Sequence, residues 1–114
     1  MAGITGIISF RDQIPQSLTF RDKSLYAMID RNIHTFLAGD KYRFEQFTNN
    51  KFAPEKILQE NENLIIGTDG VLLNLPFLLL KTGTSDMFSL LTSLYKSENK
   101  DFTKSLRGDF SGFI

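Results

Sequence analysis

The order of the apolar patterns along the chain is the feature that most constrains its fold. Ile4 to Phe10 predicts a strand with apolar residues on both faces, which is typical of a central strand. Lys41 to Phe47 alternates as a half-exposed strand in which the face carrying Arg43 need not belong to the core. Between these strands, apolar residues recur at intervals of three and four, and Gly39 follows them as a stop. They predict an amphipathic helix and are Leu25, Met28, Ile29, Ile33, Phe36 and Leu37.

The middle of the chain predicts three more strand segments joined by two turns. The first turn is Asn61–Asn63, and the second is Asp69–Gly70, a dipeptide typical of tight hairpins. We therefore expect a hairpin at Asp69–Gly70. The strand segments are 56–59, which is weakly patterned, then 64–68 and 71–73.

Helical patterns follow. Asn74 as N-cap and Pro76 in the first turn predict a short helix that ends near Thr82–Gly83. Ser85 is the expected cap of a longer helix with the apolar stripe Met87, Phe88, Leu91, Leu94 and Tyr95, and a further turn ends at Gly108 before a strand over 109–114. Because no βαβ unit repeats, the order favours an α+β sandwich over a parallel doubly wound sheet.

Composition excludes several kinds of site and partner. The 114 residues, 41% of them hydrophobic, suffice for one domain, and 13 basic residues balance 13 acidic ones. We therefore expect no nucleic-acid or membrane partner. The absence of cysteine excludes disulfides and thiolate metal sites, and one histidine cannot form an imidazole cluster, so no metal site is expected. The longest apolar run, Leu75–Leu80, is too short to span a bilayer, and a cytoplasmic protein is the default expectation.

Three stretches of the chain match a known family in order and spacing. The first is Ala2–Phe10 (AGITGIISF), the second is Asp69–Asn74 (DGVLLN), and the third runs from Gly83–Asp86 (GTSD) to Leu106–Phe113 (LRGDFSGF). They resemble the opening Cys-Gly-Ile-x-Gly, the Asn-Gly-Glu-Ile-Tyr-Asn segment, and the Ser-Asp helix with its Leu-x-Gly-x-Phe-Ala-Phe strand of one enzyme domain. This is the glutaminase domain of class II glutamine amidotransferases, the N-terminal nucleophile hydrolases that form the front half of asparagine synthetase.

The resemblance implies a fold and a molecular context. The fold would be the four-layer αββα sandwich of N-terminal nucleophile hydrolases, and residues 1–114 would be one glutaminase-like domain truncated at its C-terminus. The partner would be a C-terminal synthetase domain or subunit, and only that absent domain would use ATP and Mg²⁺. Glutamine is the ligand that the family suggests, and a homodimer is left open.

The resemblance also assigns site residues. Arg43 would pair with the α-carboxylate of glutamine, although the loop before it looks shorter than in the family. Asp86 would receive the α-amino group, and the backbone N–H of Gly70 would help to form the oxyanion hole.

Two catalytic positions depart from the family. Ala2 stands where the family has its nucleophilic cysteine, so a free α-amine could form there but no thiol could attack. Asp69 stands where an asparagine donates to the developing oxyanion, and a carboxylate has no such donor. Ala2 could be a laboratory substitution or a natural loss. Natural loss is favoured because Asp69, and Leu73 in place of the family's tyrosine, also depart.

Each retained residue has an explanation without a ligand. Asp86 could be held by its place in the first turn of a helix, Arg43 could be a solvated residue on the outward side of a strand, and Asp69–Gly70 could be a plain turn. Three functions follow: a catalytically silent scaffold domain of an asparagine-synthetase-like, ATP-dependent amide-forming protein, an inactivated fragment of a genuine glutamine-hydrolysing asparagine synthetase, or a stand-alone amino-acid-binding or interaction module. The first is preferred.

Overall fold

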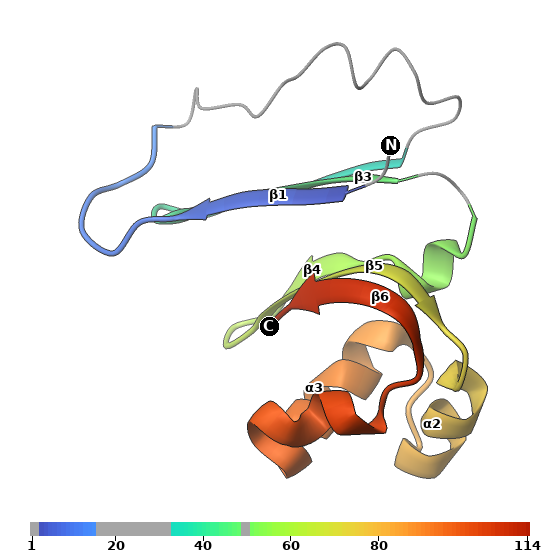
Figure 1. The fold of residues 1–114 in the computed structure, drawn as a ribbon. Helices are drawn as coiled ribbons and strands as arrows, with labels where there is room; N and C mark the ends of the chain where they lie inside the picture. Colours follow the sequence, from blue (N-terminus) through green and yellow to red (C-terminus); the bar gives the residue numbers. More distant parts are fainter. Residues whose placement is uncertain (1–2, 16–32, 49–50) are drawn as a thin grey trace.

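The computed structural model describes residues 3–15, 33–48 and 51–114, which form two stacked sheets with helices against one of them (Figure 1). Sheet A contains β1 (Gly3–Ile8), β2 (Ile33–Ala38) and β3 (Tyr42–Thr48) in the order β1-β3-β2, and both pairings are antiparallel. Sheet B contains β4 (Leu58–Glu60), β5 (Ile65–Leu72) and β6 (Gly108–Phe113) in the order β4-β5-β6, also antiparallel. The α+β class expected from the sequence is confirmed.

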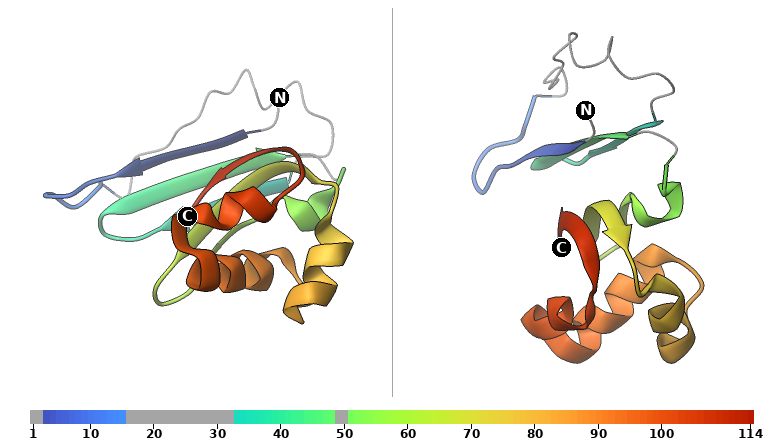
Figure 2. Two further views of the ribbon diagram at one scale, coloured as in Figure 1. Left: turned by 60° about the horizontal axis from the view of Figure 1, so that its bottom comes forward. Right: turned by 45° about the vertical axis from the view of Figure 1, so that its right-hand side comes forward.

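The helices lie on the face of sheet B that points away from sheet A (Figures 1 and 2). They are α2 (Leu75–Thr82) and α3 (Met87–Glu98), with short 3₁₀ segments η1 (Ala53–Glu55) and η2 (Asn99–Ser105). The main core fills the space between these helices and sheet B, because both contribute apolar side chains to it. Its buried members are Ile57, Ile66, Leu72, Leu78, Met87, Leu90, Leu91, Leu94 and Leu106.

The first strand is confirmed, but its predicted central position is wrong. Among the described strands, β3 has neighbours on both sides and β1 lies at the edge. Ile7 and Ile8 are accordingly exposed. Gly6 has a specific role in this strand, since a Cβ there would lie 2.1 Å from the ring of Phe44. The glycine therefore lets the ring of the central strand pack flat against its neighbour.

The predicted helix before Gly39 is wrong over residues 33–38, which form β2; its residues 25–32 lie outside the described residues. Within residues 33–38, the helical spacing depended on Ile33, Phe36 and Leu37 alone. Ile33, Thr35 and Phe36 are β-branched or aromatic residues that favour strands, and β3 offers them a full set of backbone partners. Gly39 belongs to the loop that joins β2 to β3, where its N–H donates to the carbonyl of Tyr42.

The strand predicted over Lys41–Phe47 is confirmed as β3, but the expectation that it is half-exposed is wrong. Arg43, Phe44, Glu45 and Gln46 are all buried. Both edges of a central strand are shielded from solvent by its neighbours, and both of its faces can be buried as well. The alternation along one strand does not reveal this burial.

The Asn61–Asn63 turn and the strands around it are confirmed. Asn61 Oδ1 accepts hydrogen bonds from the backbone N–H groups of Asn63 and Leu64, both at 2.9 Å, and so closes the β4–β5 hairpin.

The hairpin expected at Asp69–Gly70 is wrong, because β5 continues through both residues to Leu72 without a chain reversal. Gly70 has a φ of 127°, and a Cβ there would lie 2.3 Å from the carbonyl oxygen of Asp109 on β6. The glycine is thus required by a bend in the middle of a strand and by the close approach of its neighbour, not by a chain reversal.

The two helices are confirmed, with one changed cap. Asp86, not Ser85, is the N-cap of α3. Asn74 is the N-cap residue of α2, as expected, but its side chain makes no capping bond and instead donates to the carbonyl of Ser105 and accepts from the N–H of Arg107. Gly83, with a φ of 68°, ends α2 as expected. Among the described residues, no helix is long and apolar enough to cross a membrane.

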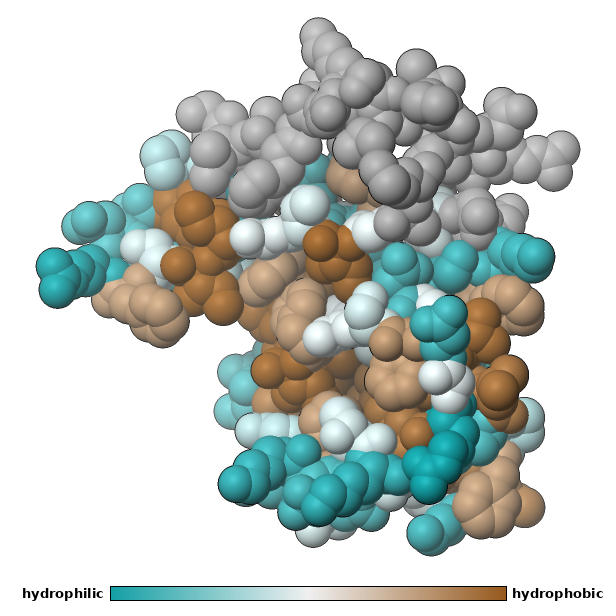
Figure 3. All heavy atoms as spheres, in the orientation of Figure 1, coloured by the Kyte–Doolittle hydropathy of each residue, from teal (hydrophilic) through white to brown (hydrophobic). Residues whose placement is uncertain are grey.

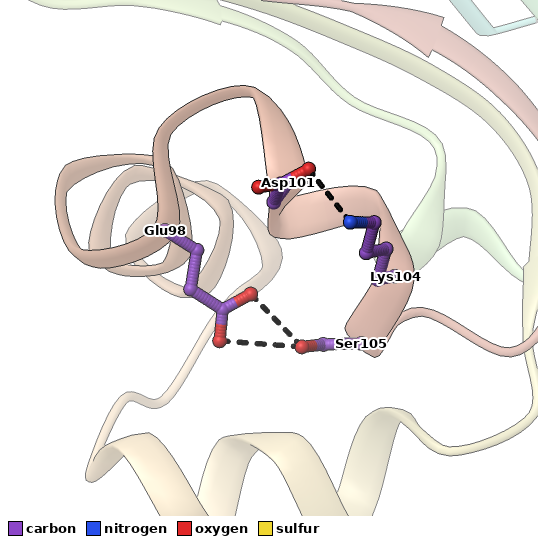
Figure 4. Close-up of polar contacts among 4 residues, drawn as sticks. All are labelled: Glu98, Asp101, Lys104 and Ser105. Atoms are coloured by element: carbon purple, nitrogen blue, oxygen red, sulfur yellow. Dashed lines mark hydrogen bonds and ion pairs between the residues drawn. The ribbon is translucent and has the colours of Figure 1, made fainter.

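The predicted turn after α3 is confirmed as η2, which two side-chain interactions tie down (Figure 4). Ser105 Oγ donates to the carboxylate of Glu98 at 3.0 Å, and Lys104 pairs with Asp101 at 3.0 Å. The segment leads directly into β6, so it fixes where that last strand begins.

Candidate functional site

Three contacts fix how the two sheets lie on each other. Ile4 Cδ1 lies 3.2 Å from the position that a Cβ of Gly67 would occupy, and Gln46 Nε2 donates to the carbonyl of Thr68 at 2.6 Å. At the other end, the hydroxyl of Tyr42 donates to Glu60 Oε2, a hydrogen bond that raises the pKa of the Tyr42 phenol.

These contacts give the direction in which β1 lies over β5. Ile4 pairs with Gln46 and Ile8 pairs with Tyr42 in sheet A, while Glu60 pairs with Ile65 in sheet B. The end of β1 therefore lies near Ile65 of β5, and the start of β1 lies near Thr68. The head of β1 and the residues just after Thr68 lie at the same end of the space between the sheets.

The residues just after Thr68 are Asp69 and Gly70. Asp69 is half-buried and pairs with Ser111 on β6. Both line an open hollow of about 390 Å³ on sheet B, together with Phe52, Lys56, Val71, Asp109, Phe110 and Ser111. Two carboxylates thus border this hollow. Ala2, which precedes β1, lies outside the described residues.

Arg43 is not brought to this end. It pairs with Ile7, whereas Gly3 pairs with Phe47, so it stands four residues, or about 13 Å, along β3 from the head of β1. Strand alternation also turns its side chain away from sheet B, because the neighbouring Phe44 stacks on Phe113 of β6. The guanidinium lies 4.4 Å from the centre of the Phe36 ring, and the residue is 7% exposed. The alternative expectation was a solvated arginine on the outward side of the strand. Arg43 does point outward, but it is buried and not solvated.

Asp86 caps α3. Its carboxylate accepts from the backbone N–H of Ser89 at 2.8 Å and from the Ser89 hydroxyl at 2.9 Å. These bonds stabilise the charged form, the backbone bond most of all, and so lower the pKa of the Asp86 carboxyl. The ligand-free explanation thus accounts for the residue type at this position.

Asp86 also lines a second, larger hollow of about 750 Å³. This hollow lies between η1, β4 and the starts of both helices, and it includes Thr35 of β2. Lys56 lines this hollow and the one at Asp69. Asp69 and Asp86 therefore open onto different hollows that share one cationic residue.

Two polar residues of β3 lie buried near the head of β1. Gln46 and Thr48 are each 1% exposed and share the face of β3 that carries Phe44. Gln46 Oε1 is buried and accepts no hydrogen bond within the part of the chain that the structure describes. The alternation along the sequence of β3 places Gln46 on this face, but no local pattern indicates that its amide would reach the other sheet.

Asp69 stands at the position where the resemblance expects an oxyanion donor. A carboxylate at Asp69 can accept hydrogen bonds but cannot donate one to an oxyanion. Across residues 3–15, 33–48 and 51–114, no three His, Asp or Glu side chains gather closely enough to hold a metal ion. Comparisons with protein-family models, curated proteins and solved structures found no match to this chain.

Proposed function

We propose that this chain is a catalytically silent, glutaminase-like domain of an asparagine-synthetase-like, ATP-dependent amide-forming protein, in which it acts as a scaffold. The proposed fold is the αββα sandwich of N-terminal nucleophile hydrolases, to which the two stacked sheets and the helical layer on sheet B would contribute three layers.

One observation carries the proposal. The contacts of Ile4 with Gly67 and of Gln46 with Thr68 set the head of β1 at the same end of the inter-sheet space as Asp69–Gly70. An N-terminal nucleophile and its oxyanion hole must be neighbours in this way, since the first attacks the carbon and the second binds the oxygen of the same carbonyl group. Two of the segments that carry the resemblance, the head of β1 and Asp69–Gly70, therefore lie at the same end of this space.

The same geometry argues for silence. The sequence has Ala2 at the nucleophile position and a carboxylate at Asp69. The loss of one oxyanion donor typically lowers the rate about 100- to 1,000-fold, and the loss of the nucleophile removes the covalent route. Arg43 at the far end of β3 leaves the glutamine carboxylate without the partner that the family pattern suggests.

The test is glutamate release from glutamine. We expect none from the 114-residue chain or from the native protein that contains it. Glutamate release by the native protein would refute the silent-domain proposal, and a cysteine at codon 2 of the native gene would instead favour the inactivated fragment of an active synthetase. The double variant Ala2→Cys, Asp69→Asn supplies a matched comparison. Because Arg43 stays at the far end of sheet A, we expect the restored pair to hydrolyse glutamine only weakly.

An amino-acid-binding module is the second candidate, favoured by the hollow that Asp86 and Lys56 line together. A carboxylate and an ammonium group could receive the two charged ends of an amino acid. Calorimetry with glutamine separates the two proposals: binding that Asp86→Asn abolishes favours the module, and the absence of binding favours the scaffold.

A further inference from the structure

The short helix α2 is apolar on both of its faces. Its inner face packs on the core through Leu75, Leu78 and Leu79. Four apolar residues are exposed on its outer side, three of them in the helix and one in the turn that precedes it. We call them the α2 stripe, and they are Leu73, Pro76, Phe77 and Leu80.

The α2 stripe is strongly exposed. Leu73 is 78%, Phe77 63% and Leu80 85% exposed. Apolar side chains reach the surface over α2 at the lower right of Figure 3. A helix that is apolar all round is normally buried, and clustered exposed apolar side chains mark interaction sites more often than isolated ones do.

Cationic side chains border the α2 stripe at both ends. Lys81 directly follows Leu80 and is exposed. Arg107 lies beside Leu73, whose N–H donates to the Arg107 carbonyl at 2.7 Å. The guanidinium is held in place, since its Nη1 donates to the carbonyls of Lys104 and Leu106. From Gly70 to Ser85 the sequence contains no Asp or Glu, and Lys81 is the one charged residue of this stretch.

We propose that the α2 stripe is a docking surface for an amphipathic helix of a partner protein, one whose apolar stripe is flanked by carboxylates. The side chains of two helices pack ridge into groove, and carboxylates beside the partner's stripe would face Lys81 and Arg107. The proposal rests on α2 and the residues beside it and does not depend on the proposed function.

The charges distinguish this partner from two others. A second copy of the chain packed on the same stripe would bring Lys81 and Arg107 toward like charges. A lipid surface would meet an apolar helix of 8 residues, about 12 Å long, whereas many helices that lie in membrane interfaces have about 20 to 30 residues.

The test uses two synthetic helical peptides of about 18 residues, each with leucines at i, i+3, i+4 and i+7. One peptide has Glu beside the stripe and the other has Lys. Binding to the 114-residue chain is measured by fluorescence anisotropy. We expect the Glu-flanked peptide to bind at least about 10-fold more tightly than the Lys-flanked one. The double variant Phe77→Ser, Leu80→Ser should weaken its binding at least 10-fold, and Lys81→Glu should remove the preference for the Glu-flanked peptide.

Phe10→Ser is the matched control, because Phe10 is 89% exposed and lies outside α2, so it should bind like the wild type. Circular dichroism verifies that each variant is folded. Equal binding of both peptides, no binding, or equal loss in Phe10→Ser would overturn the proposal. So would a dimer in sedimentation velocity that Phe77→Ser, Leu80→Ser dissociates, which would assign the stripe to a second copy. Binding to anionic vesicles that the same variant abolishes, without peptide binding, would assign it to lipid.

Discussion

Gly70 has a φ of 127° in the middle of β5, where a side chain would meet the backbone of β6. Gly70→Ala should therefore lower the free energy of unfolding by about 3 kcal/mol or more, because the backbone of one strand must shift. Urea denaturation followed by circular dichroism measures the change.

Gly83→Ala is the matched control for Gly70→Ala. Gly83 also has a positive φ, 68°, but nothing lies within 4 Å of the position that its Cβ would take. Gly83→Ala should therefore lower the free energy of unfolding by about 1 kcal/mol, through backbone strain alone. Equal effects of the two substitutions would show that the approach of β6 to Gly70 does not constrain the strand.

Asp86 stabilises α3 through its bonds to Ser89. Asp86→Ala should cost about 1 kcal/mol of unfolding free energy, the usual value for an N-cap, and Asp86→Asn should cost much less because asparagine also caps. The lowered pKa adds a pH dependence. Its contribution is fully present above the unfolded-state pKa near 3.8 and is lost as the pH falls through the folded-state pKa.

The advantage of the wild type over Asp86→Asn should therefore shrink as the pH is lowered below about 4. Urea midpoints at a series of pH values measure it. A difference between the two proteins that stays constant from pH 6 to pH 2 would contradict a role for the charged cap.

At the scale of elements, β2 shows where sequence patterns fail. Ile33, Phe36 and Leu37 fit a helical stripe, yet the segment pairs with β3 over its whole length. A spacing of three and four over six residues contains too few apolar positions to distinguish a helix from a strand. The helix α3 was predictable because its stripe extends over three turns, although the sequence placed its cap at Ser85, one residue before Asp86.

Thr35→Ala distinguishes a helix from a strand in this segment, because the two predict opposite changes in the free energy of unfolding. Alanine is the better helix former and threonine the better strand former. Because Thr35 lies in β2, the substitution should destabilise the protein by up to about 1 kcal/mol. A stabilised variant in urea denaturation would indicate that the segment is helical.

At the scale of the whole molecule, Phe44 is one of the side chains that join sheet A to sheet B. Phe44 is 6% exposed, lies over Gly6 and stacks on Phe113 with ring centres 4.7 Å apart. Phe44→Ala should cost about 3 to 5 kcal/mol, the range for removing a buried aromatic ring.

Phe10→Ala is the control for Phe44→Ala, since this exposed ring should change the unfolding free energy by less than about 0.5 kcal/mol. Both are measured by urea denaturation. A cost below 1 kcal/mol for Phe44→Ala would mean that the two sheets do not depend on this contact.

The sequence by itself determined the α+β class, most strands, both helices and the closing role of Gly83, because these depend on local alternation, helical spacing and backbone preference. It also determined that position 2 carries no nucleophile and that position 69 carries a carboxylate. The tertiary structure alone decided that β3 is central, that Arg43 is buried at the far end from the head of β1, and that Gly70 bends a strand. It also decided that Asp69 and Asp86 open onto different hollows. These facts depend on which strands pair and how the sheets stack, contacts between residues far apart in the chain that no local pattern encodes.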